Sequence, residues 1–145
     1  MKTAGDILRS KGGAIHSVTS SSTVYDALTL MAEKNIGAVL VIDQDGAIAG
    51  IFSERDYARK ITLRNLTSRK TPVADVMTRS VVFVPTARTI DECMALMTDK
   101  HIRHLPVLDG PKLVGVLSIG DVVKAVIAEK NFIIEQIEQY ISGSL

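Results

Sequence analysis

A serine followed three residues later by an aspartate occurs twice in this chain, within two segments of one pattern. Residues 50–56 read Gly-Ile-Phe-Ser-Glu-Arg-Asp, and residues 115–121 read Gly-Val-Leu-Ser-Ile-Gly-Asp. A carboxylate so placed can accept hydrogen bonds from the two hydroxyls of a ribose. A serine hydroxyl and the first N–H groups of a helix can bind a phosphate. We call each segment a signature, and together they predict nucleotide binding. The signature side chains are Ser53, Asp56, Ser118 and Asp121.

The same spacing has a structural interpretation that needs no ligand. A serine before a helix accepts a hydrogen bond from a backbone N–H of the first turn. An acidic residue three positions on favours the positive end of the helix dipole. A single Ser-x-x-Asp segment is weak support for a nucleotide site, whereas its repetition at one position of a duplicated unit favours that interpretation. Helix capping remains the open alternative.

The signatures belong to a longer internal duplication. Eight residues of the first half recur 66 positions later and the signature recurs 65 positions later, so one residue is lost between Asp109 and Lys112. The chain is therefore interpreted as two copies of one supersecondary unit. The recurring pairs are Val18–Val84, Thr23–Thr89, Leu30–Leu96, Met31–Met97, Lys34–Lys100, Ile36–Ile102, Val41–Val107 and Asp43–Asp109.

Each copy is predicted to have the order β-α-β-β-α, which gives a mixed α/β (α+β) fold class. One copy is too small to bury its sheet alone, so the two are expected to pack sheet to sheet about a pseudo-twofold axis. In the first copy the elements expected are strand 15–18, helix 24–34, strands 36–42 and 47–52, and a helix from Ser53 to Ile61. In the second copy they are strand 81–84, helix 90–99, strands 105–108 and 113–117, and helix 119–129.

The expected boundaries place the first copy at residues 5–61, a polar and basic surface linker at 62–72, and the second copy at 73–128. Residues 129–145 then form an additional amphipathic helix and tail. That helix either covers its own module or meets a partner chain, and the sequence favours neither. Its apolar stripe consists of Ile133, Ile134, Ile137, Tyr140 and Ile141.

Composition argues against several classes of function. The net charge is +1, from 17 basic and 16 acidic residues, which gives no electrostatic support for nucleic-acid or membrane-surface binding. No apolar run reaches the about 18–20 residues that span a membrane, and the first eleven residues lack the apolar core of a secretory signal. The single cysteine, Cys93, lies at helical spacing among apolar residues and is interpreted as a buried small hydrophobe. A reducing, cytoplasmic compartment is expected.

Catalysis is not expected either. The three histidines, His16, His101 and His104, have no acidic or cysteine neighbours at metal-ligand spacing. Neither a Gly-x-Gly-x-x-Gly loop nor a Walker-type loop is present, so nucleotide binding here does not imply hydrolysis. No metal and no catalytic cofactor is predicted.

The signature and its surroundings resemble a known family. Ser-Glu-Arg-Asp-Tyr (53–57), Ile-Arg-His-Leu-Pro-Val (102–107) and Ser-Ile-Gly-Asp-Val-Val (118–123) are similar to segments of stand-alone tandem CBS domains, or Bateman modules. The likeness covers nearly all of residues 5–128 and is strongest to small bacterial and organellar two-repeat proteins without a catalytic domain. It implies that Asp56 and Asp121 hold ribose hydroxyls of AMP or an NAD-type ligand, and that the two serines contact ribose or phosphate.

The resemblance also places ligand contacts where the middle strand of each copy begins. Gly37 and Ala38 leave room for a flat adenine, whereas Arg103 and His104 supply donors for phosphate. A solvated arginine and a partly buried histidine are the alternatives for the latter two. Each cleft is expected to combine the signature of one copy with the strand of the other, so that Gly37 and Ala38 belong with Asp121, and Arg103 and His104 with Asp56. The remaining candidates are Ile36, Ile102 and Arg55, followed by Lys11, His16 and Lys70.

Two functions therefore stay open. The first is a regulatory sensor that binds AMP, ADP, ATP or NAD(H) between its two copies. The second is a scaffold in which the signatures only cap helices and the C-terminal helix meets a partner protein. Two-repeat modules of this family commonly pair through their helices into a flat disc of four repeats. The resemblance therefore also implies a homodimer.

Overall fold

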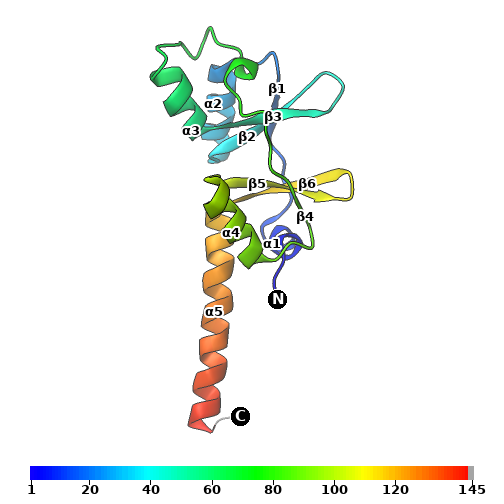
Figure 1. Ribbon diagram of the computed structural model, residues 1–145, viewed down its shortest axis with the longest axis vertical. Helices are drawn as coiled ribbons and strands as arrows, with labels where there is room; N and C mark the ends of the chain where they lie inside the picture. Colours follow the sequence, from blue (N-terminus) through cyan, green and yellow to red (C-terminus); the bar gives the residue numbers. More distant parts are fainter. Residues whose placement is uncertain (144–145) are drawn as a thin grey trace. The chain divides into compact units, whose positions relative to one another are not determined.

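The computed structural model describes residues 1–143 of the chain (Figure 1). The first half contains α1 (Ala4–Lys11), β1 (Ser17–Thr19), α2 (Val24–Lys34), β2 (Ala38–Ile42), β3 (Ile48–Ser53), α3 (Glu54–Asp56), the π-helical η1 (Tyr57–Thr62) and the 3-10 turn η2 (Val73–Asp75). The second half contains β4 (Val84–Pro85), α4 (Ile90–Lys100), β5 (His104–Asp109), β6 (Lys112–Ser118) and α5 (Ile119–Ser142). The predicted fold class, mixed α/β with two repeats and a C-terminal helix, is confirmed. The last two residues of the predicted tail lie outside the described part.

Two three-stranded sheets repeat one topology. In the first, β1 runs parallel and β3 antiparallel to the central β2; in the second, β4 and β6 flank β5 in the same way. The duplicated valines occupy equivalent registers, Val18 opposite Val41 and Val84 opposite Val107. The duplication read from the sequence is therefore a duplication of structure.

The chain folds into two compact units that exchange their opening segments. One unit spans residues 15–81, and the other joins residues 1–14 to the chain from Val82 onward. Thus α1 packs with the second copy, where the N–H of Ala4 donates to the carbonyl of Arg88 (2.7 Å). In the first unit, the N–H of Ile51 donates to the carbonyl of Thr78 (2.9 Å), which follows the linker. The predicted packing of sheet on sheet concerns the placement of one unit on the other and stays a prediction.

Each unit has its own apolar core. In the first copy, Met31 of α2 and Val73 of η2 pack in one buried cluster with Phe52 of β3. In the unit of the second copy, α1, α4 and α5 contribute Leu8, Cys93 and Val122. Cys93 is fully buried and its thiol is free, which confirms its interpretation as a small hydrophobe. Burial raises the pKa of that thiol, so it is a poor nucleophile.

The structure corrects the sequence prediction at three places. Helix α1 was not anticipated, although Thr3 and Asp6 cap it reciprocally in the same pattern as the signatures. The helix predicted from Ser53 to Ile61 is a short α3 followed by a π-helical segment. The C-terminal helix predicted within residues 129–145 is present but is not separate from the helix predicted at 119–129, because both belong to α5, one helix of 24 residues. Neither glycine nor proline occurs between residues 121 and 142, so nothing in the sequence interrupts it.

The predicted linker, residues 62–72, is exposed along most of its length but is attached to α2 at its end. The N–H of Val24 donates to the carbonyl of Thr71 (2.9 Å), and that of Tyr25 donates to Ser68 (3.0 Å). The guanidinium of Arg69 lies 3.9 Å from the ring centre of Tyr25, a cation–π contact. No helix in residues 1–143 has both the length and the apolar character needed to cross a membrane.

Candidate functional site

Both signatures lie where the last strand of a sheet ends and a helix begins. In the first, the N–H of Ser53 donates to Oδ2 of Asp56 (3.0 Å) and the N–H of Asp56 donates to Oγ of Ser53 (3.2 Å). In the second, Ser118 and Asp121 exchange the same two bonds, of 2.8 and 3.2 Å. Each pair is a reciprocal capping box. The capping interpretation is therefore confirmed for both signatures.

Capping does not by itself distinguish the signatures from other helix starts. Helices α1, α2 and α4 begin with the same reciprocal bonds, formed by Thr3–Asp6, Thr23–Asp26 and Thr89–Glu92. What sets the signatures apart is the further contacts of their carboxylates.

Asp56 is buried, with 8% of its surface exposed, and both of its oxygens are bonded within the protein. Oδ1 accepts a hydrogen bond from Oγ1 of Thr78 (3.0 Å) and forms an ion pair with Nζ of Lys60 (3.1 Å). Oδ2 accepts from the N–H and the hydroxyl of Ser53. Neither Thr78 nor Lys60 was anticipated. Lys60 follows Asp56 by four residues, an ion-pair spacing that the sequence does show, whereas Thr78 comes from beyond the linker.

Asp121 is half-buried and is bonded through one oxygen. Its Oδ2 accepts hydrogen bonds from Nζ of Lys11 (2.7 Å) and from the N–H of Ser118 (2.8 Å). Lys11 also donates to the carbonyl of Val116 (3.0 Å). Burial raises the pKa of Asp121, but the hydrogen bonds from Lys11 and Ser118 outweigh it and hold the pKa below its ordinary value. The group is therefore an ionised carboxylate at neutral pH, and Lys11 lies at the signature of the second copy.

The start of each middle strand lies beside the signature of its own copy. Ala38 pairs with Ser53, and His104 pairs with Ser118. In addition, the N–H of Ile119 donates to the carbonyl of Arg103 (2.8 Å), and Glu54 donates to Gly37 in the same way (3.1 Å). The sequence prediction placed each of these strand starts with the signature of the other copy. It did not anticipate that each also lies beside the signature of its own copy. The cross-copy grouping stays a prediction.

His104 and Arg103 differ in their surroundings. His104 is partly buried, and burial lowers its pKa more strongly than the nearby Asp121 raises it. Its ring is therefore mostly neutral at pH 7 and can donate one hydrogen bond without a charge. Arg103 is exposed, so the fixed positive charge at the start of β5 comes from the arginine.

The other predicted residues lie around these centres in their own units. Ile36 and Ile102 occupy equivalent positions. The N–H of each donates a hydrogen bond of 3.0 Å to the carbonyl of a methionine in the preceding helix, Met31 or Met97. The carbonyl of His16 accepts from the N–H of Leu40 (3.2 Å), so His16 lies beside β2. Arg55 is exposed in the first turn of α3.

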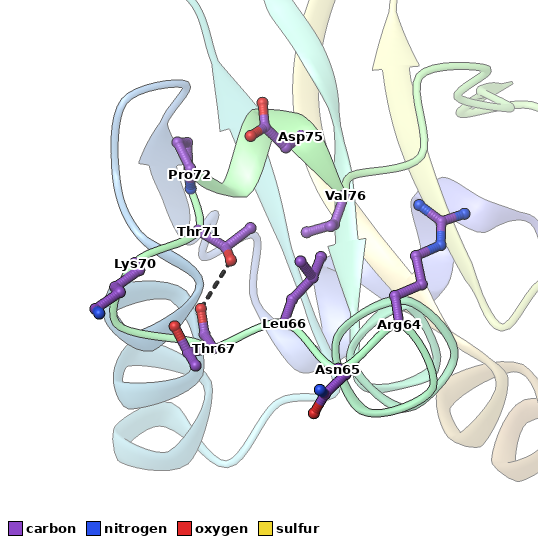
Figure 2. Close-up of a pocket in the computed structure, with 9 residues that line it drawn as sticks. All are labelled: Arg64, Asn65, Leu66, Thr67, Lys70, Thr71, Pro72, Asp75 and Val76. Carbon is purple, nitrogen blue, oxygen red and sulfur yellow. Dashed lines mark hydrogen bonds between the residues drawn. The ribbon is translucent and has the colours of Figure 1, made fainter.

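Lys70 lies at a different feature, an open pocket of about 440 Å³ beside the linker. Figure 2 shows it with Arg64 and with Thr71, whose hydroxyl donates to the carbonyl of Thr67 (2.7 Å). None of the described residues lining the pocket belongs to a signature. The lining residues are Arg64, Asn65, Leu66, Thr67, Lys70, Thr71, Pro72, Asp75 and Val76.

Two sheets of identical topology, each ending in a capped Ser-x-x-Asp, define a duplicated CBS-type unit. The family model of the CBS domain matches residues 4–63 and 73–128. The chain belongs to the CBS-domain family and carries two CBS domains in tandem.

Known proteins of similar sequence and structure are tandem CBS-domain proteins as well. The chain is 39% identical over 149 residues to the CBS domain-containing protein CBSX3, mitochondrial, of Arabidopsis thaliana, a match that covers 97% of this chain and 72% of the relative. A solved CBS-domain structure from Burkholderia ambifaria shares 55% identity with a TM-score of 0.85, over 88% of this chain and 95% of that one. The CBS domain protein PAE2072 of Pyrobaculum aerophilum, solved in complex with AMP, has the same fold at 23% identity (TM-score 0.73, over 82% and 88% of the two chains).

Proposed function

We propose that this chain is a non-catalytic regulatory module that binds an adenosine nucleotide (AMP, ADP, ATP or NAD(H)) at its signatures. Membership of the CBS family supports the proposal, and so does the AMP complex of a protein with the same fold. Neither of these identifies the nucleotide, and the geometry of Asp121 supplies the more specific argument.

The observation that carries the proposal is the state of the Asp121 carboxylate. It is ionised, partly buried and accepts both of its hydrogen bonds on Oδ2. Oδ1 is thus left to accept a hydrogen bond from a ribose hydroxyl, and a second hydroxyl can replace Lys11 on Oδ2. Charge-assisted hydrogen bonds of this kind are about twice as strong as neutral ones.

Phosphate binding at the second signature must rely largely on side chains. Of the first three N–H groups of α5, that of Ile119 already donates to Arg103 and that of Asp121 to Ser118. We therefore assign the phosphate to the exposed guanidinium of Arg103, with the neutral ring of His104 as an additional donor. A Lys11 released from Asp121 supplies a further cation.

The two signatures are expected to bind with unequal affinity. A ribose at Asp56 has to displace Thr78 or Lys60 from a carboxylate that is only 8% exposed. A displaced Lys60 keeps its hydrogen bond to the carbonyl of Val76 (2.9 Å), whereas leaving the Thr78 hydroxyl without its partner costs on the order of 1–3 kcal/mol. At Asp121 only the exposed ammonium of Lys11 has to move. The tighter site is therefore assigned to the second repeat.

Regulation would follow from the position of Lys11 at the end of α1. A ligand that replaces Lys11 on Asp121 releases the end of this helix and favours a different position of the segment that follows. Such coupling is limited by the difference in ligand affinity between the two arrangements, typically about 1–3 kcal/mol.

Thermal denaturation of the whole chain with AMP, ADP, ATP, NAD and S-adenosylmethionine tests the proposal. A ligand present at 100 times its Kd adds about 2.7 kcal/mol to the free energy of unfolding, so the melting temperature must rise with its concentration. A flat response to all five compounds contradicts the proposal. It favours a scaffold instead, a function consistent with the finding that each of the five α-helices in residues 1–143 begins with the same capping box.

The expected homodimer and cytoplasmic location stay predictions. The relative from Arabidopsis thaliana is named as mitochondrial. An organellar location is therefore kept beside the cytoplasmic one as a proposal for this chain. Either setting is compatible with an adenosine nucleotide as ligand.

A further inference from the structure

The pocket beside the linker is a feature that the proposed function does not use. Its volume of about 440 Å³ lies within the about 300–1,000 Å³ that is usual for small-molecule sites. Two cations, Arg64 and Lys70, line it, and Figure 2 shows them on opposite sides. None of the described lining residues belongs to a signature. A ligand in this pocket would therefore be a second one.

Arg64 and Lys70 differ from the neighbouring basic residues because their charges are unpaired. Within residues 1–143, neither side chain forms an ion pair or a hydrogen bond. The other three of the five basic residues between positions 60 and 79 are each held by a contact within the protein. They are Lys60, Arg69 and Arg79. The two unpaired cations of this stretch are thus the two that line the pocket.

The turn that carries Lys70 is fixed in place. The carbonyl of Thr67 accepts hydrogen bonds from both the N–H (3.1 Å) and the hydroxyl (2.7 Å) of Thr71. Thr71 is buried, and its own carbonyl accepts from the N–H of Val24 at the start of α2 (2.9 Å). A ligand therefore does not have to order this turn, which lowers the entropic cost of binding.

We infer that this pocket binds the phosphoryl group of a small molecule, at a site separate from the proposed nucleotide site. The guanidinium of Arg64 can donate two parallel hydrogen bonds to phosphate oxygens. Figure 2 shows the ammonium of Lys70 at the outer edge, and its flexible stem lets it turn toward a bound anion. The hydroxyl of Thr67, which also lines the pocket, adds a donor.

The charge at the pocket favours phosphate over a carboxylate. A phosphoryl group carries a charge of about −1.5 to −2 at pH 7, which matches two cations, whereas a carboxylate carries a single charge. One carboxylate, Asp75, also lines the pocket, so the two cations and this anion leave a net charge of +1. Asp75 is exposed, so water weakens its repulsion of a bound phosphate without removing it.

NMR titration of the whole chain with inorganic pyrophosphate tests the inference. Ionic strength is held constant with sodium chloride, because salt screens contacts of exposed charges. The amide resonances of Thr67 and Thr71 should shift and reach saturation. Phosphate should bind more weakly than pyrophosphate, and acetate more weakly still. Shifts that do not saturate, shifts confined to the signatures, or an equal response to acetate would overturn the inference.

Variants of the lining charges test the assigned contacts. The double variant Arg64→Met with Lys70→Met should weaken pyrophosphate binding at least about tenfold, because both charged donors are lost. Asp75→Asn should strengthen binding severalfold, because it removes the only carboxylate among the described lining residues. Unchanged affinity in the double variant, or weaker binding in Asp75→Asn, would show that the anion does not bind in this pocket.

Arg59→Met provides the matched control. Arg59 is exposed in η1 and does not line the pocket, so the same loss of charge should leave the affinity unchanged. A loss equal to that of the double variant would reduce the effect to net charge and overturn the inference. All four substituted positions are exposed, and circular dichroism verifies that the variants fold. No nucleotide is present in these titrations, so their outcome is independent of the proposed function.

Discussion

The ammonium group of Lys11 lies 2.7 Å from Oδ2 of Asp121, which joins residues 110 positions apart in the sequence. The corresponding contact in the first repeat is made by Thr78, whose hydroxyl lies 3.0 Å from Oδ1 of Asp56. Lys11 lies just before β1, the first strand of the first copy, and Thr78 lies between the linker and β4, the first strand of the second copy. Each signature carboxylate is thus held by the segment that leads into the other copy, so a change at a signature can reach the connection between the repeats.

Replacing the two carboxylates should have different effects on stability. Asp56→Ala removes the acceptor of the Thr78 hydroxyl, the cap of α3 and the ion pair of Lys60, whose ammonium keeps its hydrogen bond to the carbonyl of Val76 (2.9 Å), so we expect a loss on the order of 2 kcal/mol. Asp121→Ala removes a cap and a partly exposed ion pair and should cost about 1 kcal/mol. Urea denaturation of both variants measures the difference. Equal losses would contradict the buried, fully bonded state assigned to Asp56.

The ion pair between Lys11 and Asp121 should make stability depend on acid pH. The folded-state pKa of Asp121 lies below the ordinary 3.8, so its contribution is present above that value and is lost as the pH falls through the folded pKa. Lys11→Met raises the pKa of Asp121 and should flatten this acid dependence, with a loss under about 1 kcal/mol at pH 7. Urea denaturation at pH 7, 5, 3.5 and 2.5 provides the measurement. An acid dependence identical to that of the wild type would refute the contact.

His104 should contribute a second pH dependence at higher pH. Burial holds its folded-state pKa below the ordinary 6.5, so the unfolded chain binds more protons between these values. Its contribution to stability is present above about pH 6.5 and is lost as the pH falls toward the folded pKa. The imidazole resonances of His104 should titrate below pH 6.5 in NMR spectra. In the variant His104→Gln, the free energy of unfolding should decrease less between pH 7.5 and 5.5 than it does in the wild type. A titration midpoint above 6.5 would contradict this assignment.

The signature glycines should tolerate a methyl group unequally. A Cβ at Gly50 would lie 2.6 Å from the carbonyl oxygen of Thr78, whereas one at Gly115 would lie 2.6 Å from Cδ2 of Leu8. Backbone cannot move as readily as a leucine methyl, so Gly50→Ala should fall at the upper end of the about 1–3 kcal/mol usual for overpacking and Gly115→Ala at the lower end. Thermal denaturation of the two variants gives the order, and the reverse order would be inconsistent with these contacts.

The repeated helices and strands could be predicted from the sequence. The contacts that one copy makes with segments distant in the sequence could not. Duplicated residues such as Val41 and Val107 identified both hairpins, because strand alternation and turn signals are local. The partners of Asp56 and Asp121 come from distant segments, and no local pattern could show that α1 packs with the second copy. Lys11 was a candidate, but the predicted bounds of the first copy, 5–61, include it, whereas the structure joins it to the unit of the second copy.

The capping boxes show a different limit of the sequence. Ser-x-x-Asp at residues 53–56 and Thr-x-x-Asp at 23–26 form the same bonds, so spacing alone does not separate a binding carboxylate from a structural one. The difference lies in burial and in additional partners, which only the folded chain supplies. Asp26 forms the same capping box as Asp121 but is exposed and belongs to neither signature. It therefore serves as a matched control for Asp121.

The central claim is that Asp121 holds the ribose of an adenosine nucleotide, and titration calorimetry with AMP tests it most directly. Asp121→Ala should weaken binding at least about tenfold, equivalent to 1.4 kcal/mol, because the ribose loses its charged acceptor. Asp26→Ala removes the equivalent capping carboxylate of α2 and should leave the affinity unchanged. Wild-type affinity in the Asp121→Ala variant would contradict the account.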